Sequence, residues 1–212
     1  MVIIAVFGSD VQRYRREFPK LEFARPENCP RCAKPGHLVG HGSYVRGCCD
    51  HCQVFAIRVK RFLCTLCRHT LSLLPSFCIP HRHYLAVTIQ RVLTLRIQAE
   101  ASWTAIRRRF APSDLPAMTT CREWVRRFSG AARVYLDRLI DQFARWQLQP
   151  GKLELAVAEA ATRPSKPQQL VAVVPHLAAW LRDNGRVLID GGKHWLPALV
   201  SWGQAAKLGR LV

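Results

Sequence analysis

Two Cys-x-x-Cys pairs constrain the fold of this chain more than any other feature of its sequence. A tetrahedral zinc ion needs four soft or borderline donors, and a Cys-x-x-Cys turn lets two thiolates converge on one ion while nearby backbone amides stabilise their charge. The two pairs lie 31 residues apart, and the small, polar or basic residues that follow each pair suit the tight knuckle of a zinc ribbon. We therefore expect one structural Zn²⁺ with four thiolate ligands, namely Cys29, Cys32, Cys64 and Cys67.

A third Cys-x-x-Cys sequence, Cys49-Asp50-His51-Cys52, leaves the pairing of the ligands open. Cys49 and Cys52 are alternative partners of the first pair, or ligands of a second ion together with His41 or His51. We rank the alternative pairing second, because the Cys64 pair follows a β-like run directly. Four well-placed donors for a second ion are not evident, so unligated thiols are favoured at the hairpin tip. Without a metal, the same cysteines would be reduced core thiols or would form disulfides.

The charge of the chain indicates a polyanionic partner. Its 32 Lys and Arg against 14 Asp and Glu give a formal charge of +18 and a pI of about 10.4. An excess of this size is uncommon for a merely solvated surface, so nucleic acid is the first candidate. An anionic membrane would call for a long apolar span or a basic amphipathic helix beside a lipid anchor, and the sequence displays neither. No membrane partner is expected.

The cysteine usage favours a reducing compartment. Nine cysteines are compatible with a secreted disulfide scaffold, but the first seven residues lack a basic n-region and form too short an apolar run for a signal peptide. They read as a strand. The odd count and the Cys-x-x-Cys spacing favour reduced, metal-binding thiols, and we expect a cytoplasmic, nucleoid-associated protein.

The expected fold is mostly α with a small β zinc ribbon, in three regions. Residues 1–80 form the zinc-ribbon domain with an N-terminal strand, residues 81–130 a helix-turn-helix domain, and residues 131–212 a helical C-terminal region. Within the ribbon, residues 11–28 read as a polar lead-in and residues 40–46 and 54–62 as a hairpin. Prolines make residues 74–84 an extended connector, in which Cys78, His81 and His83 read as packing or exposed residues rather than ligands.

From Tyr84 the apolar period changes from 2 to 3.6, which predicts helices. A first helix is expected over residues 82–98, a second from an N-cap at Ser102, and a third from a cap at Thr119 or Thr120. Eight residues, 111–118, separate the last two, so a winged or expanded turn is needed in place of the usual three or four residues. A plain helical bundle with a basic exterior is the alternative.

The third helix has a basic outer face that suits the major groove of DNA. Arg122 and Arg126 lie one turn apart, as do Glu123 and Arg127, so two rows of side chains would face base edges. Arginine grips guanine, and a glutamate accepts from cytosine. The remaining expected contacts, to phosphates, are Arg107, Arg108, Arg109, Thr119 and Thr120.

The C-terminal third carries apolar helical faces and no catalytic pattern. A helix is expected over residues 130–149, and a longer one over residues 168–184 buries Leu170, Val173, Val174, Leu177, Trp180 and Leu181 in the core or, alternatively, in a homodimer seam. Residues 187–208 hold a turn and a helix. The Asp, Asp and Glu of a two-metal recombinase are not recognisable here, so we do not expect an enzyme.

The ribbon and the helices that follow it resemble a known family. The motifs are Cys29-Pro30-x-Cys32, His41-Gly42-Ser43-Tyr44-x-Arg46, Val59-x-Arg61-Phe62-x-Cys64-x-x-Cys67, residues 70–77 and Tyr84. They look like the zinc-ribbon front end of bacterial insertion-sequence transposases and small related proteins of unassigned role, over about residues 26–130. The resemblance implies a helix-turn-helix after the ribbon, binding to mobile-element or other double-stranded DNA, and zinc on the four ligands already named. The inserted cysteines at positions 48, 49 and 52 depart from it.

Taken together, the sequence predicts a non-enzymatic protein that binds double-stranded DNA sequence-selectively. Its expected role is that of an accessory, targeting or regulatory subunit of a mobile element, with a transposase or further nucleoprotein subunits as partners. Three rival functions remain: an RNA-binding or ribosome-associated ribbon, a nuclease or transposase component, and a protein-interaction module.

Overall fold

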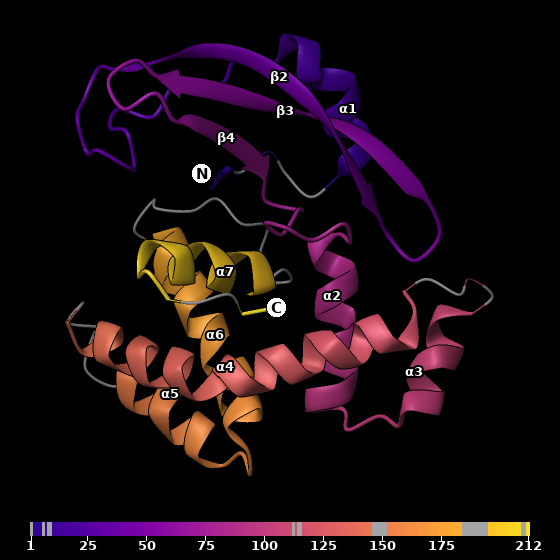
Figure 1. Ribbon diagram of the computed structural model, residues 1–212. Coiled ribbons are helices and arrows are strands. Elements are labelled where there is room, and N and C mark those ends of the chain that lie inside the picture. Colours follow the sequence, from indigo (N-terminus) through magenta and orange to yellow (C-terminus); the bar gives the residue numbers. More distant parts are fainter. Residues whose placement is uncertain are drawn as a thin grey trace. The chain divides into compact units, whose positions relative to one another are not determined.

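The computed structural model describes residues 2–5, 7, 10–111, 113, 116–145, 152–183, 195–208 and 211–212 (Figure 1). It divides into two compact units, Met1–Leu85 and Ala86–Val212. The first unit contains the only sheet among the described residues, and the second is helical. About half of the chain is helical, so the expected combination of helices with a small β region is confirmed.

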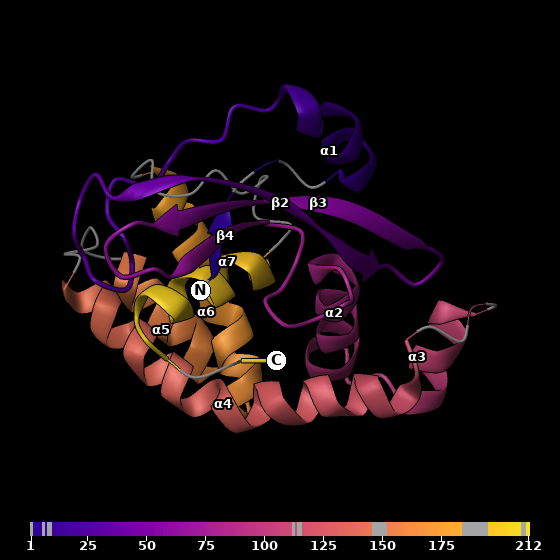
Figure 2. The same ribbon diagram turned by 45° about the horizontal axis from the view of Figure 1, so that its top comes forward.

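The sheet of the first unit has four strands in the spatial order β1-β4-β3-β2 (Figure 2). β1 (Val2–Ala5) confirms the expected N-terminal strand and pairs parallel to β4 (Thr70–Pro75). β2 (Leu38–Cys49) and β3 (Val54–Cys64) form the expected hairpin, which is longer at both ends than the apolar alternation indicated. Cys48 and Cys49 therefore belong to a strand and not to the hairpin tip.

The two faces of the sheet carry separate apolar clusters, and β2 contributes to both of them across an irregularity in the hairpin. The β2–β3 register shifts between Gly40 and Ser43, where Gly42 has a φ of 67°. Successive side chains of a strand point to opposite faces, and the extra residue of a bulge reverses this alternation only in the strand that contains it, here β2. β3 itself stays in regular register with β4, so its buried residues divide between the two faces: Phe55, Ile57 and Val59 lie on one, Phe62 and Cys64 on the other. The first three join one cluster, and the last two join another that contains the paired cysteines.

A helix that the sequence analysis missed covers the first cluster. The predicted polar lead-in is wrong for residues 11–20, which form α1 (Val11–Glu17) and a 3₁₀ turn, η1 (Phe18–Lys20). Asp10 Oδ1 caps α1 by accepting from the backbone N–H groups of Gln12 and Arg13 at 2.8 and 3.0 Å. Tyr14 is buried and donates its hydroxyl proton to the carbonyl of Arg58 at 2.8 Å.

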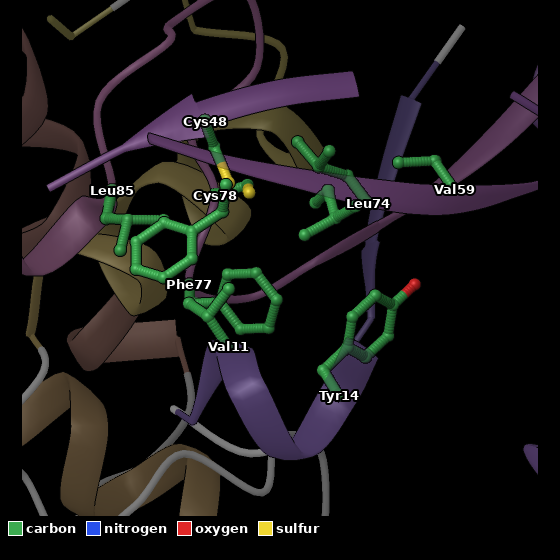
Figure 3. Close-up of a cluster of buried hydrophobic side chains, with 10 residues drawn as sticks. Val11, Tyr14, Cys48, Val59, Leu74, Phe77, Cys78 and Leu85 are labelled. Carbon is green, nitrogen blue, oxygen red and sulfur yellow. The ribbon is translucent and has the colours of Figure 1, made fainter. Parts of the chain in front are cut away.

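The segment after β4 completes the first cluster (Figure 3). Residues 74–80 are all buried, and Phe77 meets the ring of Tyr14 edge-on at 5.3 Å between centroids. The thiols of Cys48 and Cys78 lie against each other, and this contact lowers the pKa of Cys48 and raises that of Cys78. The apolar residues of the expected connector thus belong to the core of the first unit.

Helices account for the regular structure described in the second unit. α2 continues directly into a π-helical turn, η2, and α4 contacts α2, α5 and α6, while α7 contacts α2 and α6 (Figure 2). The bounds are α2 Ala86–Leu93, η2 Thr94–Gln98, α3 Trp103–Phe110, α4 Met118–Arg145, α5 Lys152–Ala161, α6 Lys166–Asp183 and α7 Trp195–Ala205.

α4 replaces two helices that were expected on either side of residue 130. It runs unbroken through Gly130, so the expected domain boundary at 130 falls inside a helix. The reason is that its buried positions keep the helical spacing across this point, with Phe128, Ala132 and Tyr135 all buried. Gly130 is exposed, and a single glycine in a helix interior lowers the stability of the helix without ending it.

The apolar face of α6 is core. Leu170, Val173, Val174 and Leu177 are each fully buried within the second unit. The expected contributions of Trp180 and Leu181, and the expected turn over residues 187–192, lie outside the described residues. The helix expected towards the C-terminus is α7. No helix in the described part of the chain combines the length and apolarity that a membrane span requires.

Candidate metal centre

The four predicted ligands converge at one end of the first unit. The Sγ atoms of Cys29 and Cys67 lie 3.7 Å apart and those of Cys32 and Cys64 3.8 Å apart. All four sulfurs lie within 4.8 Å of one another. Thiolates about 2.3 Å from a tetrahedral ion would be about 3.8 Å apart. The donor set and its spacing therefore fit a single tetrahedral ion.

The two Cys-x-x-Cys turns have the same backbone hydrogen bonds. In the first, the N–H of Ala33 donates to the carbonyl of Cys29 at 2.8 Å; in the second, the N–H of Arg68 donates to the carbonyl of Cys64 at 2.9 Å. The first cysteine of each pair also donates its own N–H, to the carbonyls of Lys34 and His69 respectively. Two equivalent turns thus present two thiols each to the same point.

The sheet brings the two turns together. Leu38 at the start of β2 pairs with Cys64 at the end of β3, and the N–H of Thr65 donates to the carbonyl of His37 at 2.8 Å. Buried apolar residues of β2, β3 and β4 then surround the sulfurs: Leu38, Phe62, Leu71 and Leu73. The strand register therefore positions the second pair against the first.

The electrostatics of the cluster favour a bound cation. Backbone N–H groups of Cys32 and Arg31 lower the pKa of the Cys29 thiol to about 6. The amide of His69 acts in the same direction on Cys67, but burial and hydrogen bonds with the other three thiols outweigh it and raise the pKa of Cys67 to about 11. Four adjacent thiols cannot all ionise alone, since each thiolate opposes the next, whereas a divalent cation removes this repulsion.

The remaining cysteines of the first unit do not belong to the cluster of four thiols. Cys49, an expected alternative ligand, directs its thiol to the carbonyl of His83 at 3.7 Å. Cys52 is exposed at the hairpin tip beside Asp50 and His51, and these three form a second cluster of potential metal ligands within the described residues. Cys78 is buried while His81 and His83 are exposed, which agrees with the expected packing roles. His41 is exposed and joins neither cluster.

Comparison with known proteins identifies one related family over this region. Residues 29–109 match a family model. Its description is "Domain of unknown function (DUF6431)". The match covers less than half of the chain, including all four converging cysteines, α2 and all but the last residue of α3, and it ends before α4. No curated protein and no solved structure shows a significant match.

The expected phosphate contacts lie at the end of the matched region and just beyond it. Arg107, Arg108 and Arg109 are exposed in the last turn of α3. Ser102 caps this helix as expected, accepting from the N–H of Ala105 at 3.2 Å. The expected capping role of Thr119 and Thr120 is wrong, because α4 already begins at Met118 and both threonines lie inside its first turn.

The expected base-reading residues of α4 interact with one another. Arg126 donates from Nε and Nη2 to the carboxylate of Glu123 at 2.7 and 2.8 Å, and Arg127 donates from Nε to it at 2.5 Å. These hydrogen bonds lower the pKa of Glu123 to about 2. Arg126 still has 72% of its side chain exposed. Glu123 therefore orients two arginines, a role that the residue order did not reveal.

The ring of Trp103 in α3 contacts one arginine from each of two other elements, η2 and α4. Arg96 of η2 lies over its ring at 5.5 Å from the centroid, and Arg122 of α4 at 5.7 Å. Residue order revealed neither contact, since cation–π pairs between separate elements leave no periodic signal. The result is a single half-buried ring that holds arginines from two elements.

Proposed function

We propose that this chain binds double-stranded DNA sequence-selectively, through a helix-turn-helix made of α2, α3 and the N-terminal half of α4. The observation that carries the proposal is the placement of exposed arginines on α3 and α4, two helices that Trp103 and Arg122 connect. Such side chains, on two helices that share a ring contact, can engage phosphates and base edges at the same time. The formal charge of +18 supports a polyanionic partner.

The roles divide according to what each arginine contacts in the protein. Arg107, Arg108 and Arg109 have exposed side chains at a helix end, which suits phosphates. Arg126 bonds Glu123 through Nε and Nη2, so the N–H donors of Nη1 remain for a guanine or a phosphate. Glu123 then acts as a positioning residue, because it restricts the rotamers of Arg126 before DNA arrives.

The four converging cysteines, Cys29, Cys32, Cys64 and Cys67, would hold Zn²⁺. The ion supplies structural stabilisation of the two Cys-x-x-Cys turns, whose thiols otherwise repel one another once ionised. Nothing in this role requires an open ligand position. The resemblance to transposase front ends supports a biological context in which the chain serves a mobile element as an accessory, targeting or regulatory subunit.

Fluorescence anisotropy with DNA duplexes selected from a random pool tests the proposal. We expect the logarithm of affinity to fall with the logarithm of salt concentration, with a slope of about −0.9 per phosphate neutralised. Changing Arg107, Arg108 and Arg109 together to Gln is expected to weaken binding on every duplex and reduce the slope by up to about 3. Arg138→Gln is the matched control, as an exposed arginine about 18 Å further along α4 than Arg126.

Arg126→Gln separates base reading from phosphate contact. A loss of about 1–3 kcal/mol confined to duplexes with one particular base pair marks Arg126 as a base-reading residue. Equal loss on all duplexes would instead make it a phosphate contact. Tighter binding to a folded RNA at the same salt, or metal-dependent strand cleavage, would overturn the proposed function in favour of an RNA-binding protein or a nuclease.

A further inference from the structure

The tip of the β2–β3 hairpin is a closed and internally hydrogen-bonded turn. The N–H of Asp50 donates to the carbonyl of Gln53 at 3.1 Å. Asp50 Oδ1 in turn accepts from the N–H groups of Cys52 and Gln53 at 2.6 and 2.8 Å. An aspartate that binds its own backbone two and three residues further on holds such a loop in one conformation. The side chains at the tip therefore project from a defined backbone.

Three different donor types meet at this tip. A carboxylate oxygen of Asp50, an imidazole nitrogen of His51 and the thiol sulfur of Cys52 lie within 4.8 Å of one another. Ligands bonded at about 2.0–2.3 Å to a tetrahedral ion lie about 3.3–3.8 Å apart. Rotation of the exposed Cys52 side chain between ordinary rotamers is enough to close a difference of this size. Imidazole and thiolate together select borderline ions such as Zn²⁺ over Mg²⁺ or Ca²⁺.

We propose that Asp50, His51 and Cys52 form a second metal site, which binds one divalent borderline ion such as Zn²⁺. With a thiolate, a carboxylate and a neutral imidazole, the ligand set balances the charge of a divalent ion. Three protein ligands leave a fourth position for water or another donor. The ion at this site is therefore exchangeable, unlike one enclosed by four thiolates.

The ligand set differs from the Cys-x-x-Cys pair that the sequence suggested. Cys49 is buried and its thiol donates to the carbonyl of His83, so it is directed away from the tip. Cys48 is buried against Cys78 in the core. Of the three cysteines in residues 48–52, only Cys52 is exposed. The second site thus uses consecutive residues of one turn, which a pattern search for paired cysteines misses.

Metal stoichiometry of the full chain tests the second site. One sample is loaded with Zn²⁺, desalted and analysed for bound metal, and a separate metal-free sample is titrated with Co²⁺ while cobalt–thiolate absorbance is recorded. We expect two ions per wild-type chain. Cys52→Ser and His51→Ala are each expected to leave one ion and to weaken Co²⁺ binding at the tip at least tenfold, with the four-thiolate absorbance unchanged.

Cys49→Ser is the matched control, since it removes the other thiol of the same Cys-x-x-Cys sequence and should retain two ions. A wild-type chain that binds one ion overturns the proposal. So does a second ion that Cys49→Ser abolishes and Cys52→Ser does not. If His51→Ala and Asp50→Asn both leave the second ion in place, it binds to the exposed thiol alone and the site does not exist. Far-UV circular dichroism of each variant checks that the fold is retained. The outcome is independent of DNA binding.

Discussion

Ala33 and Arg68 occupy equivalent positions in the two Cys-x-x-Cys turns and share the same left-handed backbone conformation, with φ values of 56° and 58°. Each follows the second cysteine of its pair, and each donates its N–H to the carbonyl of the first. This conformation costs a non-glycine residue roughly 1–2 kcal/mol. This unfavourable conformation occurs twice, each time next to the four converging thiols. We infer that the convergence of the thiols imposes the geometry of both turns.

Replacing either residue with glycine should stabilise the zinc-loaded protein. Ala33→Gly and Arg68→Gly each remove the left-handed strain but lose about 0.5–1 kcal/mol to backbone entropy, so we expect a net gain of about 0.5–1 kcal/mol in the free energy of unfolding. Urea unfolding measures it. Lys34→Gly, at a neighbouring position without positive φ, should lower stability, and equal effects at positions 33 and 34 would contradict the argument.

Removing one thiol of the cluster should unfold the metal-dependent part of the first unit. Cys64→Ser is expected to lose the four-thiolate ion and the protection of β2 and β3 against hydrogen exchange, because the binding free energy of the ion contributes to the folding of the strands that adjoin the two turns. A strong chelator should do the same to the wild type. Cys121→Ala alters a buried cysteine of the second unit and should keep the ion. Full protection of the strands without metal would contradict a structural role.

The carboxylate of Glu123 should titrate at a pH far below that of an ordinary glutamate. Hydrogen bonds from Arg126 and Arg127 lower its folded pKa to about 2. Its contribution to stability is therefore present above the unfolded pKa, near 4.5, and is lost as pH falls towards 2. Carboxyl-detected NMR gives the midpoint directly. Changing both arginines to Gln should return it towards 4.5, and a wild-type midpoint already there would show that the pairs do not persist in solution.

Gly203 should tolerate no side chain. A Cβ at this position would lie 2.5–2.8 Å from ring and hydroxyl atoms of Tyr135, whose buried ring also contacts Trp202. We expect Gly203→Ala to destabilise the second unit by about 1–3 kcal/mol through overpacking. Gly130→Ala on α4 meets open space and should instead stabilise by about 0.5–1 kcal/mol. Thermal unfolding distinguishes the two, and a shift in the same direction for both would refute the packing argument.

The hydrogen bond from the Tyr14 hydroxyl should contribute to holding α1 on the sheet. Tyr14→Phe leaves the ring contacts intact and removes the donor to the Arg58 carbonyl, at an expected cost of about 0.5–1.5 kcal/mol in the free energy of unfolding. Denaturant unfolding measures the cost. Amide exchange of α1 should accelerate in the same variant, and unchanged exchange there would assign the loss elsewhere.

Several parts of the fold and of the metal centre could be predicted from residue order because short-range physics determines them. The convergence of the two Cys-x-x-Cys pairs follows from ligand chemistry at fixed spacing, and the buried faces of α3 and α4 follow from the helical period. The Ser102 cap was equally local. α1 was missed because a helix of seven residues is too short to give a convincing period, and its stability comes from burying Tyr14.

Residue order by itself determined the chemistry of this protein: four thiols spaced for one ion, a large positive charge, and apolar stripes that commit the second half to helices. Tertiary structure alone decided which atoms meet. It directed the Cys49 thiol to the carbonyl of His83 and placed Cys52 beside Asp50 and His51. It also joined two expected helices into α4 and placed arginines of separate elements over the ring of Trp103. The physical reason is that periodicity and ligand preference act over a few residues, whereas strand register and side-chain packing depend on residues far apart in the chain.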